Sequence, residues 1–218
     1  MSTRTMLVVT VLIVVLAGAW SAWQYPTMPE RVPTHWNVRG EVDGWGSRDV
    51  GAWLMPGMMV FMLALFLVLP LLSPVRYKIE SFRPVWNAVI TLVMAMFGAM
   101  HVIILHASLH PHVDVGRILI AVICLFMAAL GLFMPKVRRN FWMGVRTPWT
   151  LASDEVWTAT HRLAGWTMGV GGLVAALLAV AGVTLLLAFG LVMAGALYPV
   201  LYSLWLYKRL EREGQAGE

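Results

Sequence analysis

Charged residues are scarce in this sequence, and cysteine is almost absent. Only 12% of the 218 residues are Asp, Glu, Lys or Arg, 60% are hydrophobic, and the mean hydropathy is +0.75. Soluble domains carry roughly 25% charged residues, so an ordinary soluble protein is excluded. The single cysteine, Cys124, excludes an intrachain disulfide and a thiolate metal cluster. The bilayer is therefore the solvent of most of this chain.

Long apolar runs predict the number of membrane crossings. A helix needs about 20 apolar residues to cross roughly 30 Å of hydrocarbon. Four such runs are present, at Met6–Trp23, Gly51–Leu72, Val85–Ala107 and Ile118–Met134. The uncharged stretch Leu163–Leu206 is about twice the length of one span, which predicts a helical hairpin that turns near Gly182. We therefore expect an all-α polytopic membrane protein with six transmembrane helices. Because the first run lacks a small-x-small cleavage site, we interpret it as a retained span.

The few basic residues predict the orientation. If the N-terminus is inside, 12 of the 16 Lys and Arg residues fall on the inner side, whereas the 11 acids divide six to five. Short cytoplasmic loops retain Lys and Arg, so both chain ends are predicted to be cytoplasmic. The net charge of +5 could suggest a nucleic-acid partner. Since the basic residues lie in short loops between apolar runs, we expect no direct nucleic-acid binding.

Catalytic and ion-transport signatures are absent from the sequence. No Asp, Glu, Lys or Arg lies in the interior of a predicted span, which disfavours an ion-coupled pump or transporter. The sequence contains no Gly-x-Ser-x-Gly, P-loop, His-Glu-x-x-His or paired intramembrane carboxylates. We expect no enzyme, no catalytic residue and no cofactor.

The segment between the first two spans, about residues 24–50, combines three prolines with three glycines. Proline favours extended backbone and glycine permits positive φ, so the segment is predicted to be a shaped loop. His35, Asn37 and Asp43 could form a metal or acid–base cluster. Alternatively, Asn37 and Asp43 satisfy turn backbone and His35 caps the loop.

The inner segment 135–162 is the second polar region. Ser153 followed by Asp154 predicts a helix start, and that helix would place Trp157 and His161 on one face. Its basic residues can be topology signals and contacts to anionic lipid. Arg146 fits that interpretation less well, because its guanidinium could tie the loop to backbone carbonyls or to a partner.

Histidines near the end of the third run form a possible metal site. His106 and His110 stand four residues apart and are followed by His112 and Asp114, although Pro111 interrupts the helix between them. The alternative is a set of interfacial loop histidines. His101, within the third run, is expected to bond a neighbouring helix.

Two motifs resemble the SdpI family of bacterial immunity proteins. The outer motif runs from Val32 to Trp45, and it resembles the N-terminal membrane domain of unknown function found in that family. Its residues are Pro33, Thr34, His35, Trp36, Asn37, Gly40 and Asp43. The inner motif is similar to the Asn-x-x-x-Gly-Ile-Arg-Thr-Pro-x-Thr pattern of the family and is followed by a Trp and a His. Its residues are Asn140, Gly144, Arg146, Thr147, Pro148, Trp157 and His161.

The resemblance implies a bacterial plasma-membrane protein that protects its cell against a secreted peptide toxin. It also implies toxin sensing, in which a cytoplasmic transcriptional repressor is sequestered at the membrane. The outer motif would then meet the toxin and the inner motif would transmit the response. We divide the chain into residues 1–83, with the outer loop, residues 84–134, with helices three and four, and residues 135–218, with the inner loop and the C-terminal hairpin. A membrane-embedded metal-dependent hydrolase and a small-molecule or lipid transporter are the alternatives.

Overall fold

The computed structural model describes residues 1–37, 39–74, 77–110 and 112–214. Arg76, one of the basic residues assigned to the inner side, and Pro111 lie outside the described residues. The α-helices are α1 (Thr3–Gln24), α2 (Arg48–Val68), α3 (Arg83–Leu109), α4 (Val115–Gly131), α5 (Pro148–Ala152), α6 (Asp154–Val180) and α7 (Leu185–Arg212). Short 3-10 turns are η1 (Tyr25–Thr27), η2 (Leu69–Leu72), η4 (Ile79–Phe82) and η5 (Met134–Lys136).

Six of these helices are long and apolar enough to cross a membrane, as the apolar runs predict. The fold class is confirmed: the chain is a multi-pass helical membrane protein. The turn between α6 and α7 contains Gly182 at φ +87°, where the uncharged stretch predicts it. Ser153 caps α6, because its side chain accepts a hydrogen bond from the Val156 N–H.

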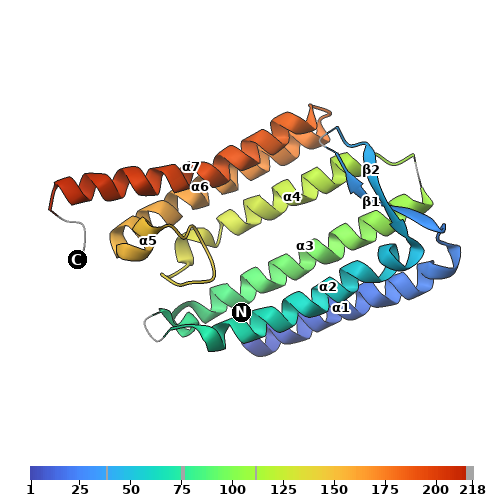
Figure 1. The fold of residues 1–218 in the computed structure, drawn as a ribbon, viewed down its shortest axis with the longest axis horizontal. Helices are drawn as coiled ribbons and strands as arrows, with labels where there is room; N and C mark the ends of the chain where they lie inside the picture. The colour runs from blue at the N-terminus through green and yellow to red at the C-terminus, as the bar shows by residue number, and fades with distance from the viewer. Residues whose placement is uncertain (38, 75–76, 111, 215–218) are drawn as a thin grey trace.

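The helices form two groups (Figure 1). Helices α1, α2 and α3 pack together, as do α4, α6 and α7, and the two groups meet where α3 packs against α4. The start of α1 and the end of α7 lie at the end of the bundle that also holds α5 (Figure 1). The N-terminal ammonium donates to the Pro84 carbonyl at 3.4 Å, which ties the chain start to the start of α3. We call this the inner end and the opposite one the outer end, following the predicted orientation.

The outer segment is a β-hairpin, a feature that the prediction of a shaped loop did not include. Strands β1 (Arg31–Trp36) and β2 (Val42–Ser47) pair antiparallel, with Arg31 opposite Ser47 and His35 opposite Gly44. In a two-stranded sheet both strands are edges, so Pro33 can sit in β1 without breaking a central ladder. The hairpin crosses the outer end of the bundle (Figure 1).

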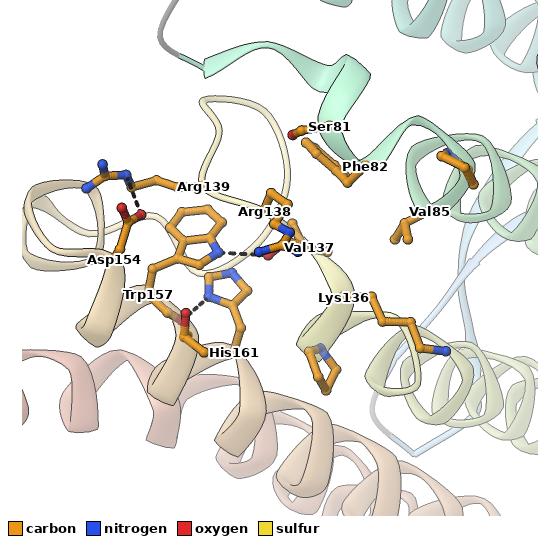
Figure 2. Close-up of a pocket in the computed structure, with 13 residues that line it drawn as sticks. Ser81, Phe82, Val85, Lys136, Val137, Arg138, Arg139, Asp154, Trp157 and His161 are labelled. Atoms are coloured by element: carbon orange, nitrogen blue, oxygen red, sulfur yellow. Dashed lines mark hydrogen bonds and ion pairs between the residues drawn. The ribbon is translucent and has the colours of Figure 1, made fainter.

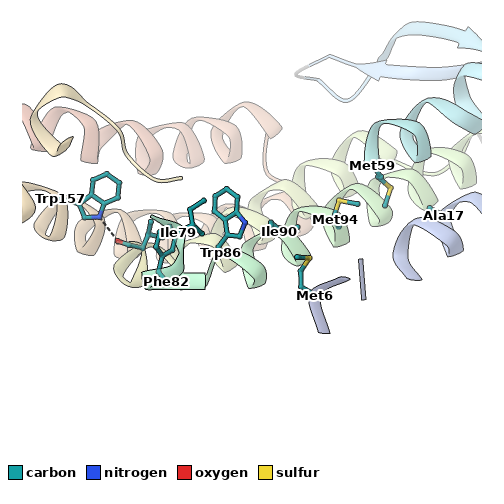
Figure 3. Packing of buried hydrophobic residues seen from close by; sticks show 10 residues of the cluster. Met6, Ala17, Met59, Ile79, Phe82, Trp86, Ile90, Met94 and Trp157 are labelled. Atoms are coloured by element: carbon teal, nitrogen blue, oxygen red, sulfur yellow. Dashed lines mark hydrogen bonds between the residues drawn. The ribbon is translucent and has the colours of Figure 1, made fainter. Parts of the chain in front are cut away.

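The larger core follows α3 through the first helical group. Met6, Met59, Trp86 and Met94 are buried along this line (Figure 3). The same cluster reaches Trp157 at the start of α6, so apolar packing connects the two helical groups at the inner end.

The second core, between α4, α6 and α7, is rich in alanine. Its fully buried residues include Ala175, Ala179 and Ala188. Small side chains let membrane helices approach closely and gain van der Waals contact. This group is therefore held by backbone proximity more than by large side chains.

Candidate functional site

Asn37 and Gly40 shape the tip of the outer hairpin. The Asn37 side-chain oxygen accepts from the Arg39 N–H at 2.8 Å and from the Glu41 N–H at 3.1 Å, and its amide donates to the Glu41 carboxylate at 2.8 Å. Gly40 has φ +84°, a conformation that a side chain would strain. Asn37 thus satisfies turn backbone, as one sequence interpretation proposed.

His35 and Asp43 form a pair across the hairpin. Nδ1 of His35 lies 2.5 Å from Oδ1 of Asp43, and the two side chains are 71% and 45% exposed. Asp43 therefore contacts His35, whereas the turn interpretation assigned it to backbone. The pair lies at the outer surface, where it can meet a ligand arriving from outside the bundle.

The hairpin is anchored on both helical groups. At its base, Val32 packs so close to Gly51 of α2 that a Cβ on Gly51 would overlap the Val32 side chain. At its tip, the Gly40 backbone lies on Gly116 of α4, and a Cβ on Gly116 would overlap the Gly40 Cα. The hairpin is thus a strap that connects the first helical group to the second.

Two cavities lie beneath this strap. The first, of about 270 Å³, is bounded by motif residues of the hairpin and by apolar side chains of α2, α3 and α4; its lining includes Thr34, His35, Trp36, Asn37, Met100 and Ile123. The second, of about 310 Å³, is lined by Pro33, Trp36 and Trp45 together with residues at the end of α3 and the start of α4. Trp36 contributes to both. The outer motif therefore gives two apolar cavities a partly polar rim.

Asn140 organises the backbone of the inner loop. Its amide donates to the Arg138 and Met143 carbonyls at 2.7 and 3.0 Å, and its carbonyl accepts from the Trp142 and Met143 N–H groups, each at 2.7 Å. The side chain is fully buried. Both polar atoms of the Asn140 side chain are therefore hydrogen-bonded within the loop, as is usual for buried polar groups.

Gly144, Trp157 and His161 hold this loop against α6. The Trp157 and His161 rings stack with centroids 4.0 Å apart, which confirms that they share one helix face. His161 Nδ1 donates to the Trp157 carbonyl at 2.8 Å, and Nε2 accepts from the Val145 N–H at 3.1 Å (the former bond is drawn in Figure 2). Gly144, at φ +108°, lies against Nε2, and a Cβ there would overlap it. The arrangement fits only a neutral imidazole that carries its proton on Nδ1.

Thr147 and Pro148 begin helix α5. Thr147 and Thr150 form a capping box, and Pro148 occupies the first helical turn, where its missing N–H costs nothing. The Thr147 hydroxyl lies 3.1 Å from the Ser203 hydroxyl of α7, so the motif also holds the last span. Arg146 is exposed and donates to the Phe141 carbonyl, which agrees with a role in tying the loop to backbone.

The remaining histidines do not gather into a metal site within the described residues. The His106 and His110 rings stack at 4.1 Å between centroids, and His110 Nδ1 lies 3.1 Å from the His106 carbonyl. Within the described residues, no three His, Cys, Asp or Glu side chains, His112 included, come together as a metal site. His101 Nε2 lies 2.7 Å from the Ser21 hydroxyl of α1, so it bonds a neighbouring helix as predicted.

Sequence reasoning missed the partners that complete both motifs. Two of these partners, Gly116 and Ser203, are far from the motif residues that they contact along the chain. The third is the Val137 carbonyl, which accepts from Trp157 Nε1 at 2.8 Å and has no distinctive sequence pattern. Gly116 directly after the Asp114–Val115 helix start is the one local signal, because a small residue in a first turn permits close approach.

Comparisons with known proteins match the two motif regions. Residues 136–203 match the model of the SdpI/YfhL protein family, and residues 12–60 match a domain of unknown function, DUF1648. The chain is 25% identical to Immunity protein SdpI of Bacillus subtilis (strain 168) over 205 residues, which cover 93% of this chain and 96% of that protein. No solved structure matches. The family match covers the inner loop and the last two spans, and the similarity to Immunity protein SdpI extends along almost the whole chain.

Proposed function

We propose that this protein is an immunity protein of the bacterial plasma membrane that protects its cell against a secreted peptide toxin. The observation that carries the proposal is the similarity to Immunity protein SdpI along almost the whole chain. The proposed orientation, with both ends in the cytoplasm, follows from the excess of Lys and Arg at the inner end.

The strap and the cavity of about 270 Å³ beneath it are the proposed toxin site. The floor of this cavity is formed by Met55, Met100, Ile104 and Ile123, while His35 and Asn37 lie at its rim. Flexible methionines and branched aliphatic side chains suit an apolar segment, and the polar rim suits peptide backbone. A membrane-active peptide combines these two chemistries.

A survival assay tests the proposal. A sensitive bacterium expressing this chain should survive challenge with secreted toxin peptides that kill the parent strain. Ile123→Trp, which fills the cavity, should reduce survival at least tenfold. Ile118→Trp is the matched control on the same helix, because Ile118 is 40% exposed and lies outside the cavity lining. Equal protection by both variants would show that the toxin does not bind in this cavity. If the parent chain protects against no toxin peptide, the proposed function is refuted.

We also propose that the inner loop transmits toxin binding to a cytoplasmic transcriptional repressor. Most of the inner motif is buried, and its exposed residues are Arg146 and Pro148. A partner could contact only these two and the exposed Phe141 beside the motif. A two-hybrid or membrane-recruitment assay with repressors encoded beside the gene, with and without toxin, measures this step. Recruitment that is independent of toxin would contradict it.

A further inference from the structure

A further cavity lies at the inner end, apart from the proposed toxin site and against two residues of the inner motif. It has a volume of about 780 Å³ and lies between the two helical groups. Ser81, Phe82 and Val85 of the first group face Lys136 and Arg138, and Trp157 and His161 form a further wall (Figure 2). The stacking and capping interactions of the inner motif leave this space open.

The charge of the lining is positive. Arg139 is neutralised, because its Nε lies 3.0 Å from the Asp154 carboxylate and its guanidinium also donates to the Leu151 carbonyl. Asp154 is the one acid in the lining. Lys136 and Arg138 are exposed and form no ion pair or side-chain hydrogen bond within the described residues. Two cationic side chains are thus available to a ligand.

The cavity lies at the level in the bilayer where lipid headgroups are expected. Lys136 is the last residue of the fourth candidate span, Phe82 and Val85 lie in the first turns of the third, and Asp154 begins the fifth. Span ends mark the boundary between hydrocarbon and water. The lining also includes Phe82, Val85 and Val137, whose apolar side chains suit the glycerol and first methylene groups of a lipid.

We propose that this cavity binds the phosphate headgroup of an anionic phospholipid, held by Lys136 and Arg138. Arginine can donate two parallel hydrogen bonds to a phosphate, and lysine adds a mobile point charge. A lipid seated there would bridge α3 and α6 across the gap between the two helical groups. The site is independent of the toxin site, so it stands or falls separately from the proposed function.

Native mass spectrometry of the purified full-length protein, titrated with phosphatidylglycerol in detergent micelles, tests the site. Each Lys or Arg removed near an anionic lipid should weaken binding about fivefold, so K136Q/R138Q should bind about 25-fold more weakly. K136R/R138K keeps both charges and should bind within about threefold of the parent. The matched control R4Q/R212Q removes the same charge from exposed residues at the same end and outside the cavity, and it should leave binding unchanged.

Further arms separate the possible sources of the anion. Phosphatidylcholine should be retained poorly because its choline cation faces the same charges. Inorganic phosphate that binds with the same dependence on Lys136 and Arg138, without retention of phosphatidylglycerol, would assign the site to free phosphate and overturn the lipid proposal. Preferential binding of an acidic peptide would overturn it as well, as would equal losses in K136Q/R138Q and R4Q/R212Q. Thermal unfolding of each variant without lipid shows whether it is folded.

Discussion

The contact between Gly144 and His161 gives the sharpest test of how the inner motif is built. In Gly144→Ala the new Cβ would overlap Nε2 of His161, and the residue would be held at φ +108°. A non-glycine residue in such a conformation costs about 1–3 kcal/mol. Displacing the imidazole also breaks its bond to the Val145 N–H, and an unsatisfied buried donor costs about 1–3 kcal/mol.

The two effects together lower the free energy of unfolding by about 2–6 kcal/mol. For a chain of this size each kcal/mol shifts Tm by about 2–4 °C, so Gly144→Ala should melt at least about 4 °C below the parent. The measurement is thermal unfolding in detergent, followed by tryptophan fluorescence. Gly190→Ala is the control, because a Cβ at this helical glycine meets no atom within 4 Å.

A double-mutant cycle isolates the contact. His161→Ala removes the overlapping ring, so adding Gly144→Ala in that background should cost only the backbone strain of about 1–3 kcal/mol. If Gly144→Ala melts within about 1 °C of the parent, or if its cost is the same with and without His161, the described packing does not stabilise the loop.

Three further predictions follow from the fold. In a cysteine-free background, E41C should react with an impermeant thiol reagent applied to intact cells and A152C should not, because both positions are exposed and lie at opposite ends of the bundle. The reverse labelling pattern would overturn the predicted orientation. Gly116→Ala should displace the hairpin tip from α4 and speed proteolysis of the hairpin at least fivefold. This is expected even though alanine raises helix propensity by up to about 1 kcal/mol. An unchanged cleavage rate would show that the hairpin tip does not pack on Gly116. Arg146→Lys keeps the positive charge but loses the planar guanidinium, so cells that express it normally should survive toxin challenge less well if the guanidinium ties the loop to the Phe141 carbonyl. Unaltered survival would show that Arg146 acts only as a topology signal.

The spans could be predicted because they depend on composition alone. A run of about 20 apolar residues crosses the hydrocarbon whatever its neighbours are, so the number of helices, the turn at Gly182 and the cap at Ser153 follow from local sequence. The strand pairing of the outer segment did not follow. Its prolines and glycines indicate a shaped loop, and its pairing depends on a register between residues such as Arg31 and Ser47, which local patterns do not fix.

Local sequence is enough to predict a six-span helical protein with one polar motif near each end of the bundle, because hydropathy and helix caps are local properties. Tertiary structure alone decided what the motif residues touch. It placed the hairpin tip on Gly116, set His161 against Gly144, and left Lys136 and Arg138 beside an open cavity between the two helical groups. These contacts join residues distant in the chain, and they depend on how closely backbones approach, which follows from the packing of all six spans together.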